Sequence, residues 1–220
     1  MIKITFIGDV TCDNPLLNQS RLNKGVYNFS KVFYNTKNLF EKTEYVIGNF
    51  ETVSYRSDTD YNNEFFMYNC PSRFIKDMGA SGIQFVTTAN NHCLDQGIAG
   101  LISTLDNLDK YGIEHTGTFR NKKEREQIKI LNIGNIKIAI LSYTYSTNES
   151  NTGIVLSGET DYFVGLLRKQ RNTLLETESI KNKIAVRLNP KNRRLIKRYL
   201  NKLKMKLGMK IFKPVADFVL

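Results

Sequence analysis

The chain has 220 residues, of which 41% are hydrophobic and 24% are charged, and its formal net charge is +11. This composition supports a folded core and excludes a chain that is disordered throughout. No run approaches the roughly 20 apolar residues of a membrane-spanning helix, and the N-terminus lacks the pattern of a signal peptide. We therefore expect a cytoplasmic protein, with peripheral attachment to a membrane as the alternative. The 3 cysteines show no Cys-x-x-Cys spacing, which indicates free thiols rather than a disulfide framework.

The positive charge is concentrated in one segment. Residues 181–213 contain 13 Lys and Arg and neither Asp nor Glu, which leaves 19 basic and 21 acidic residues elsewhere. Leu195 and Leu203 fall on one helical stripe of this segment, with basic side chains around it. Such a helix would bind an anionic membrane surface or an anionic polymer, cover a partner domain, or pack on its own protein. We expect no nucleic-acid binding, because the segment lacks interleaved aromatic residues.

The first third of the chain is predicted to contain two strands, each followed by polar residues. Asp9 follows the first strand, and Glu51 follows the second. Ser30 is the expected N-cap of a helix between them, and Pro71 is expected to open the next helix. The predicted elements are strands at residues 3–7 and 45–48, a loop at 12–28, and helices at 30–42 and 71–78.

The most informative stretch is residues 85–97, an apolar strand that ends in polar residues. The candidate site residues after the strand are Asn90, Asn91, His92 and Asp95. A helix is predicted next, at residues 96–111, because leucine and isoleucine recur there at three- and four-residue steps. Asp95 lies where an N-cap would accept the first free backbone amides of that helix.

The chain then returns to strands. His115 lies in a short predicted strand and is the second of the 2 histidines. Gly134-Asn135 predicts a tight hairpin turn between two alternating segments. The expected elements are a strand at residues 113–117, a charged turn at 122–126, paired strands at 128–133 and 136–141, and a short apolar element at 162–167.

Polar groups thus follow three predicted strands, at Asp9, Glu51 and Asn91-His92. In an open α/β sheet, the carboxyl ends of parallel strands meet at the edge where ligands bind. Carboxylate and amide oxygens at such an edge suit a hard metal ion or a phosphate group. The sequence therefore predicts an α/β fold, a layered sheet flanked by helices, with a candidate site at this edge.

These motifs, in this order, resemble those of the bacterial capsule synthesis protein CapA family, which is linked to poly-γ-glutamate capsule production. The resemblance covers residues 2 to about 150, and Ala89-Asn90-Asn91-His92 is its most specific element. The other matching elements are Gly8-Asp9, Asn49-Phe50-Glu51, Asp95 with Gly97, Gly100-Leu101 with Thr104-Leu105, Gly112 to Gly117, and Tyr143-Thr144-Tyr145 with Asn148.

The resemblance implies a metallo-dependent phosphatase-like fold and a divalent metal, Mn or a similar ion. Asp9, Glu51 and Asn91 would be metal ligands, and His92 would be the catalytic acid or a phosphate-contacting group. The residues expected to contact substrate or to support the ligands are Asn90, Asp95 and His115. Capsule-synthesis proteins are the implied protein partners, and an anionic polymer or a phosphorylated compound is the implied substrate.

The family's later motifs, a His followed by Gly and Glu and a Gly-His-x-His type loop, are absent, because no histidine follows His115. We therefore expect an incomplete fold of this class. Residues 1–150 would form the family domain, and residues 151–220 a basic helical extension or the start of an interrupted second half. Three functions stay open: metal-dependent phosphoester hydrolysis in capsule or polyanion biosynthesis, catalytically inactive binding, and membrane or polyanion binding through residues 181–213.

Overall fold

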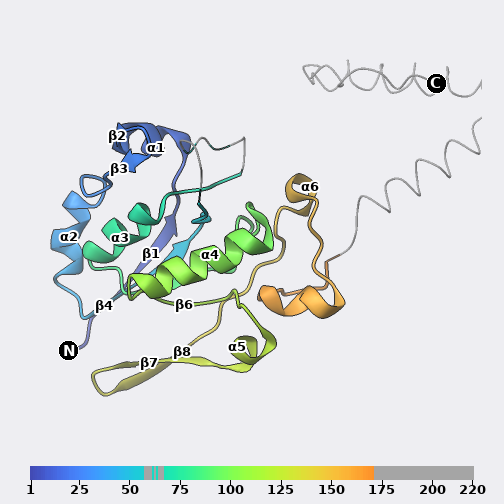
Figure 1. The fold of residues 1–220 in the computed structure, drawn as a ribbon. Coiled ribbons are helices and arrows are strands. Elements are labelled where there is room, and N and C mark those ends of the chain that lie inside the picture. Colours follow the sequence, from blue (N-terminus) through green and yellow to red (C-terminus); the bar gives the residue numbers. More distant parts are fainter. Residues whose placement is uncertain (57–60, 62, 64–66, 171–220) are drawn as a thin grey trace, which may run out of the picture. The chain divides into compact units, whose positions relative to one another are not determined.

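Four parallel strands form the centre of the structure, in the order β1-β4-β5-β6 (Figure 1). The computed structural model describes residues 1–56, 61, 63 and 67–170. The central strands are β1 (Ile4–Val10), β4 (Tyr45–Phe50), β5 (Phe85–Thr87) and β6 (Glu114–Thr116). Because all four strands run in the same direction, their carboxyl ends meet at one edge. The predicted α/β class, a sheet flanked by helices, is confirmed.

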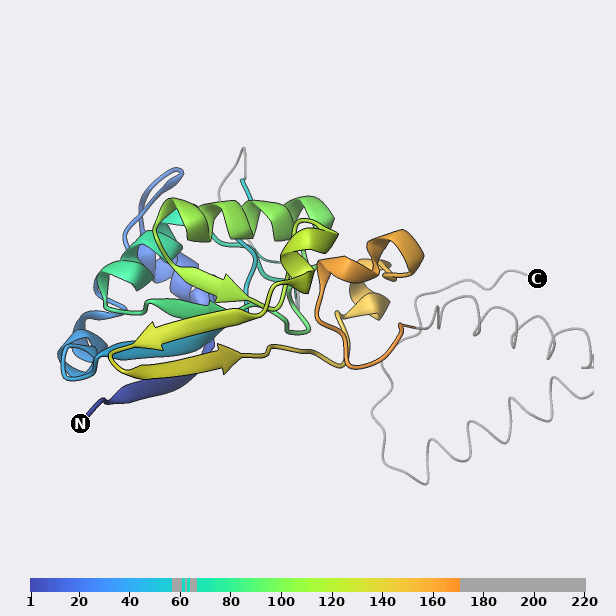
Figure 2. The same cartoon turned by 90° about the horizontal axis from the view of Figure 1, so that it is seen from below.

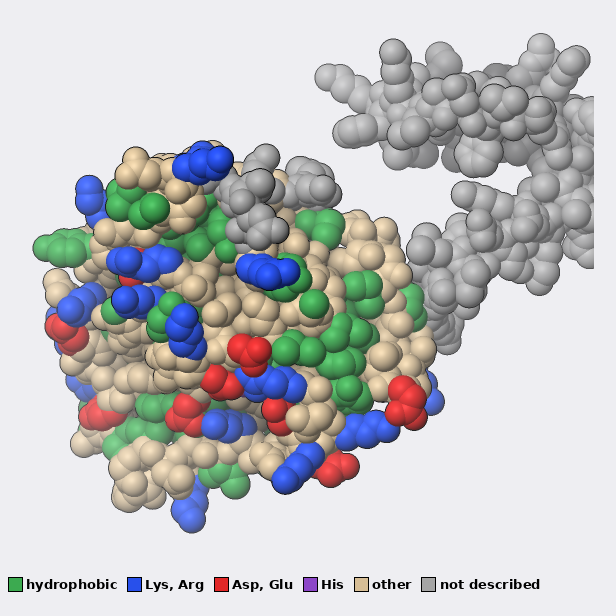
Figure 3. Space-filling view, viewed as in Figure 1, with side chains coloured by type: hydrophobic (Ala, Val, Ile, Leu, Met, Phe, Trp, Pro, Cys, Tyr) green, Lys and Arg blue, Asp and Glu red, His purple; other side chains and the backbone are tan. Residues whose placement is uncertain are grey.

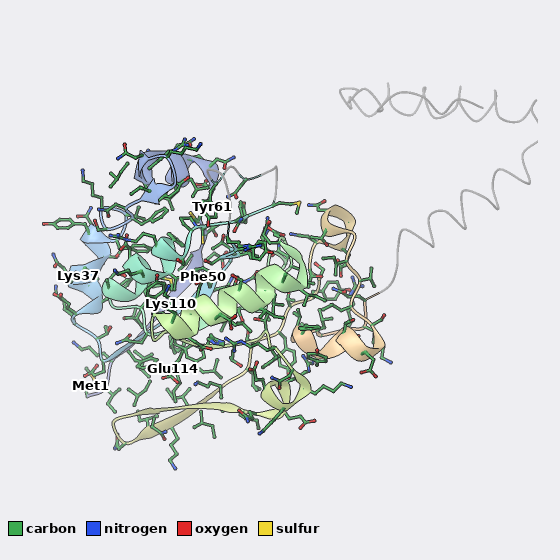
Figure 4. The ribbon with its side chains drawn as sticks, viewed as in Figure 1. Met1, Lys37, Phe50, Tyr61, Lys110 and Glu114 are labelled. Atoms are coloured by element: carbon green, nitrogen blue, oxygen red, sulfur yellow. The ribbon has the colours of Figure 1, made fainter. Side chains whose placement is uncertain are left out.

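The two central strands of the sheet, β4 and β5, are buried on both faces, which explains their apolar residues, whereas Phe6 of the edge strand β1 is 68% exposed. Val46 and Val86 belong to a large core shared with the helices, whereas Ile47 and Phe85 belong to a smaller core shared with a hairpin. Phe50, labelled in Figure 4, lies in the larger core and packs against the ring of a phenylalanine in α3. Alternate residues of the strands therefore hold the two outer layers in place.

The helical layer is dominated by α4, whose boundaries agree with the prediction to within a residue. Its buried leucines, Leu101, Leu105 and Leu108, lie on the face that contacts the core. Gly100 allows a close approach, because a Cβ there would lie 3.0 Å from a Val53 methyl carbon. The helices are α1 (Asn14–Ser20), α2 (Tyr34–Phe40), α3 (Ser72–Ala80), α4 (Gly97–Lys110), α5 (Lys122–Glu126), α6 (Glu149–Thr152) and the 3-10 helix η1 (Gly158–Phe163).

A two-stranded antiparallel hairpin covers the other face of the sheet (Figures 1 and 2). Leu131 and Ile133 point into the smaller core, while Ile130 and Ile136 remain 52% and 42% exposed. Gly134 takes a positive φ of 58° at the turn, as the predicted hairpin requires. The hairpin strands are β7 (Lys129–Ile133) and β8 (Ile136–Ile140), and a second small pair is β2 (Arg21–Asn23) with β3 (Val26–Tyr27).

Several predicted boundaries were wrong. The helix expected at 30–42 begins at Tyr34 with Phe33 as its N-cap, and Ser30 instead lies in a turn closed by the Asn28 side chain. The loop expected at 12–28 contains α1, β2 and β3, and Asp13 caps α1. The charged turn at 122–126 is the short helix α5. These elements are short, so they carry little hydrophobic periodicity.

Residues 151–170 contribute to the same core as the sheet and the helices. Leu156, Phe163 and Val164 are buried in the larger core, and Val164 pairs with Thr118 in an isolated antiparallel bridge. Basic and acidic side chains are interspersed on the surface seen in Figure 3. Within the described part of the chain, no helix has the length and apolar character to cross a membrane. The predicted basic helix at residues 181–213 lies outside the described residues.

Candidate functional site

Asp9 and Asn49 lie side by side near the carboxyl ends of β1 and β4. They are paired in the sheet register, and the Asn49 side-chain amide donates a 2.7 Å hydrogen bond to Asp9 Oδ1. The register shifts between Phe6 and Asp9, an irregularity of the kind that re-aims side chains near functional sites. Asp9 is exposed. The amide of Asn49 therefore fixes the orientation of an accessible carboxylate.

Glu51 directly follows β4, and its backbone N–H donates a 3.1 Å hydrogen bond to the Val10 carbonyl of β1. Partial burial raises the pKa of Glu51, and the hydrogen bond to Asp9 and repulsion from its charge raise this pKa further. The charge of His92 and a hydrogen bond from Thr11 act in the opposite direction. The two carboxyl groups predicted to share a site are thus in direct contact.

Asn90 connects these strand ends to the loop after β5. Its side-chain NH₂ donates to the Phe50 carbonyl over 2.8 Å and to Asn49 Oδ1 over 3.2 Å. Its side-chain oxygen accepts a 3.1 Å hydrogen bond from the backbone N–H of His92. Asn90 is buried, and both ends of its amide are engaged. It therefore positions the loop rather than offering a free ligand.

His92 and Asp95 form a buried pair in this loop. His92 Nδ1 lies 2.7 Å from Asp95 Oδ2, and the side chains are 8% and 0% exposed. The backbone N–H of Tyr68 donates a 2.6 Å hydrogen bond to the same carboxylate oxygen, and the Tyr68 ring lies 4.3 Å from the imidazole ring. A carboxylate only accepts hydrogen bonds, so Nδ1 carries the shared proton. The other ring nitrogen, Nε2, makes no hydrogen bond to another described residue.

The prediction that Asp95 caps α4 was wrong. The N-cap is Gln96, and it makes no side-chain capping hydrogen bond. Asp95 is instead drawn back toward His92 in a tight turn, in which the Asp95 N–H donates to the His92 carbonyl over 3.0 Å. Its carboxylate is therefore committed to the imidazole and to Tyr68.

Asn148 reaches the same imidazole from the chain that follows β8. Its side-chain nitrogen lies 3.4 Å from His92 Nδ1, a longer contact than that of Asp95. Asn148 has a φ of 53° and is the one non-glycine residue with positive φ among those described. Strain of this kind often accompanies functional positions. The contact brings the start of α6 beside the loop after β5.

Asn91, the third predicted metal ligand, is half-buried and makes no side-chain hydrogen bond to another described residue. Its amide oxygen is therefore available to bind a ligand. Sequence reasoning assigned no site role to Asn49, Tyr68 or Asn148. Asn49 carried a usable signal, because it is a polar residue inside an apolar strand, whereas Tyr68 and Asn148 come from loops distant in the sequence.

The structure places His115 in a different cluster. Its Nε2 lies 3.0 Å from Asp109 Oδ1 of α4, and Arg120 also binds Asp109. Burial lowers the pKa of His115, although Asp109 acts in the opposite direction. Glu114, labelled in Figure 4, projects from the same strand toward the hairpin and pairs with Lys129 over 2.6 Å. The contacts of His115 thus involve none of the residues around His92.

The donor chemistry at the sheet edge fits a hard divalent cation. Two ionised carboxyl groups in contact repel each other, and a cation between Asp9 and Glu51 would relieve that repulsion. The amide oxygen of Asn91 would add a neutral oxygen ligand. Among the described residues there is no cluster of three or more His, Cys, Asp or Glu side chains that could hold a metal. These residues alone therefore fit one incompletely coordinated ion.

Comparison with known proteins identifies the family. Residues 3–199 match the family described as bacterial capsule synthesis protein PGA_cap. The chain belongs to this family. The "PGA biosynthesis protein CapA" of Bacillus subtilis is 21% identical over 178 residues, which are 78% of this chain and 46% of that protein. The "Capsule biosynthesis protein CapA" of Bacillus anthracis is 23% identical over 146 residues, which are 65% of this chain and 34% of that protein.

A further relative, the uncharacterized protein y4sH of Sinorhizobium fredii, is 28% identical over 108 residues. That match covers 48% of this chain and 23% of the relative. The chain thus spans less than half the length of each of these curated relatives. The predicted resemblance is confirmed, and the family links the chain to capsule biosynthesis.

Proposed function

We propose that this chain binds a divalent cation and hydrolyses a phosphoester during the biosynthesis of a capsule or a similar polyanionic polymer. The observation that carries the proposal is the contact between the Asp9 and Glu51 carboxyl groups, beside a buried His92–Asp95 pair. Asp9 lies near the carboxyl end of β1, Glu51 directly follows β4, and the His92–Asp95 pair lies in the loop that follows β5. This edge is the usual ligand-binding edge of a parallel sheet.

Each residue has a distinct role in this proposal. Asp9, Glu51 and Asn91 would hold the cation, Mn²⁺ or a similar ion. When bound, such an ion would polarise a phosphoryl oxygen of the substrate and lower the pKa of a water molecule. His92 would contact the phosphate or donate a proton to the leaving oxygen through Nε2.

Asp95 supports the role of His92 without touching the substrate. Its carboxylate holds Nδ1 at 2.7 Å, which fixes the orientation of the ring and leaves Nε2 as the ring nitrogen that would face a substrate. Asn90 and Asn49 hold the loop and the Asp9 carboxylate in position through amide hydrogen bonds. These contacts support the proposed roles of His92 as the acid and of Asp9 and Glu51 as the cation-binding pair.

The substrate class follows from the family and from the charge of the site. The names of the Bacillus relatives refer to PGA and capsule biosynthesis. For this chain we propose a phosphorylated intermediate of a polyanionic, poly-γ-glutamate-like polymer, with other capsule-synthesis proteins as partners. A cation at Asp9 and Glu51 would also offset the repulsion between these carboxylates and an anionic substrate.

A second candidate function is binding without catalysis. It is favoured by the finding that no three His, Cys, Asp or Glu side chains of the described part form a metal-holding cluster. A site with few protein ligands binds a cation weakly, and the same crevice would then hold a sugar phosphate, a polymer or a partner protein.

One experiment separates these two functions. The purified chain is dialysed against Mn²⁺, its bound metal is measured by mass spectrometry, and hydrolysis of para-nitrophenyl phosphate is followed. We expect bound Mn²⁺ to fall in Asp9→Asn and Glu51→Gln, and we expect turnover to fall by about 10²–10⁴-fold in His92→Ala. Glu41→Gln, an exposed position on α2's C-terminal side, is the matched control and should change neither quantity.

The outcomes are distinct. If the chain binds Mn²⁺ but shows no turnover that depends on His92, the result would support binding without catalysis and would reject phosphoester hydrolysis. Loss of turnover in His92→Ala with metal content unchanged would support the proposed division of roles. The absence of both bound metal and turnover in the wild-type chain would reject the proposed metal site.

A further inference from the structure

An apolar groove lies between the edge strand β1 and the hairpin strand β8, on the hairpin face of the sheet (Figure 2). Its volume is about 320 Å³, and its lining includes Phe6, Ile47, Ile140 and Leu141. Among the described residues, β1 pairs only with β4 and β8 only with β7. The outer layer of the structure therefore stops at β8 and leaves the face of β1 uncovered.

Two large apolar side chains remain exposed at this groove. Phe6 is 68% exposed, and Leu141 is 70% exposed. Phe6 pairs in register with Ile47, which belongs to the smaller core, so both side chains lie on the hairpin face of the sheet. Grooves lined mainly by apolar groups, with a few polar groups at one end, are typical ligand sites.

One end of the groove is continuous with the candidate functional site. Asn49 lines the groove, and its side-chain amide also donates the 2.7 Å hydrogen bond to Asp9 Oδ1. Thr87 lines the groove as well, and its hydroxyl donates to Asn49 Oδ1 over 3.2 Å. A molecule whose anionic end bound a cation at Asp9 would therefore have its other end beside this apolar surface.

The chemistry of the lining selects the kind of molecule that fits. None of the described lining residues is charged, so a chain of carboxylates placed here would lose water without gaining a countercharge. Asn49 and Thr87 have the only described lining side chains that can hydrogen-bond, and both are already hydrogen-bonded. Sugar hydroxyls would therefore find few partners. A hydrocarbon chain needs none and would cover Phe6 and Leu141.

We propose that this groove binds the apolar tail of the substrate, which would be a phosphate ester of a long-chain alcohol. The inference rests on the proposed function, because the phosphate would meet the cation at Asp9 and Glu51. Hydrolysis would add water across the phosphorus–oxygen bond and release the alcohol and inorganic phosphate. The phosphorylated intermediate of polymer biosynthesis would then be one that carries a hydrocarbon chain.

The test compares binding of butylphosphonate and octylphosphonate to the full chain by isothermal titration calorimetry in a buffer that contains Mn²⁺. The two ligands share a head group and are not hydrolysed, so the result does not depend on turnover. Complete burial of one methylene group improves affinity about fourfold. In an open groove we expect roughly two- to threefold for each of the four added methylene groups, which is a Kd roughly 16–80-fold lower for octylphosphonate.

Variants locate the tail. Phe6→Ser and Leu141→Ser should each reduce the preference for octylphosphonate and leave the Kd of butylphosphonate unchanged. Leu39→Ser, at a 60% exposed position on α2, is the matched control and should change neither Kd. Asp9→Asn should weaken binding of both ligands and leave their ratio unchanged. Because Phe6 and Leu141 are exposed, we expect these variants to fold, and the wild-type ratio alone is decisive if they do not.

The outcomes separate this inference from the proposed function. Equal Kd values for the two ligands, no binding of either, or a preference that survives both Phe6→Ser and Leu141→Ser would overturn the tail site. Turnover of para-nitrophenyl phosphate could still stand in each of these cases. A preference that depends on Phe6 and Leu141 without any turnover would support the tail site and reject hydrolysis. Light scattering that shows dimers dispersed by Phe6→Ser, with no octylphosphonate binding, would make the groove an interface between copies and overturn the proposal.

Discussion

Replacing Asp95 with Ala would remove a carboxylate whose side chain is 0% exposed and whose Oδ2 accepts two hydrogen bonds. One comes from the Tyr68 N–H at 2.6 Å and the other from His92 Nδ1 at 2.7 Å. In Asp95→Ala both donors would stay buried without an acceptor, and each such donor costs about 1–3 kcal/mol. We expect the free energy of unfolding to fall by about 3–5 kcal/mol, the range measured when one partner of a buried pair is removed.

The measurement is urea denaturation of the full chain, followed by circular dichroism, with the same slope m for variant and wild type. For a protein of this size, a loss of about 3–5 kcal/mol corresponds to a fall in Tm of roughly 6–20 °C. Asp95→Asn should cost much less, about 1 kcal/mol, because its amide oxygen still accepts both hydrogen bonds.

The second histidine–aspartate pair provides a matched control. Asp109 also binds a histidine, His115, but its side chain is 58% exposed. Solvent screens an exposed pair, so Asp109→Ala should cost no more than about 1 kcal/mol. If Asp95→Ala and Asp109→Ala lower the free energy of unfolding equally, then burial does not make the hydrogen bonds of Asp95 more stabilising than those of the exposed pair.

Three further predictions test other parts of the structure. The folded protein raises the pKa of Glu51, so ionised Glu51 opposes folding as the pH rises through that pKa. The free energy of unfolding is measured by denaturation without metal between pH 3 and 8. At pH 7 it should be larger for Glu51→Gln than for the wild type, by less than about 1 kcal/mol because the group is partly exposed. At pH 3 the two proteins should have the same free energy of unfolding. Gly117→Ala should lower the Tm, because φ is +116° and the new Cβ would lie 2.6 Å from the Ala89 backbone nitrogen; an unchanged Tm would contradict this packing. Asn148→Ala should lose about 1–2 kcal/mol in urea denaturation through its left-handed backbone, whereas Asn148→Gly should not, and equal losses would mean that the backbone strain is unimportant.

Local signals predicted the long elements of the fold well. Helix α4 was predicted at residues 96–111 and spans Gly97–Lys110, because its apolar residues recur at helical spacing over four turns. The hairpin β7–β8 followed from two alternating segments and a Gly134-Asn135 turn. The short helices α1 and α5 were missed, because one or two turns contain too few residues to establish a period.

The candidate site was predictable only where it follows from strand order. Asp9, Glu51 and Asn91 were predicted to converge because parallel strands end at one edge, and the structure brings Asp9 and Glu51 into contact. Tyr68 and Asn148 could not be predicted in this way, because loops distant in the sequence bring them to His92. Whether any of these residues binds a metal or a substrate stays a prediction.

The asparagines explain how neutral hydrogen bonds hold the Asp9 carboxylate in one orientation. The Asn49 NH₂ donates to Asp9, while its oxygen accepts from Thr87 Oγ1 at 3.2 Å and from Asn90 at 3.2 Å. A flipped amide would present its oxygen to the Asp9 carboxylate, so these hydrogen bonds allow one orientation of Asn49. These hydrogen bonds connect Asp9 on β1, through Asn49 on β4, to Asn90 in the loop after β5. The side-chain oxygen of Asn90 also accepts a hydrogen bond from the backbone N–H of His92. Asp9 and His92 are therefore connected by one neutral hydrogen-bond network.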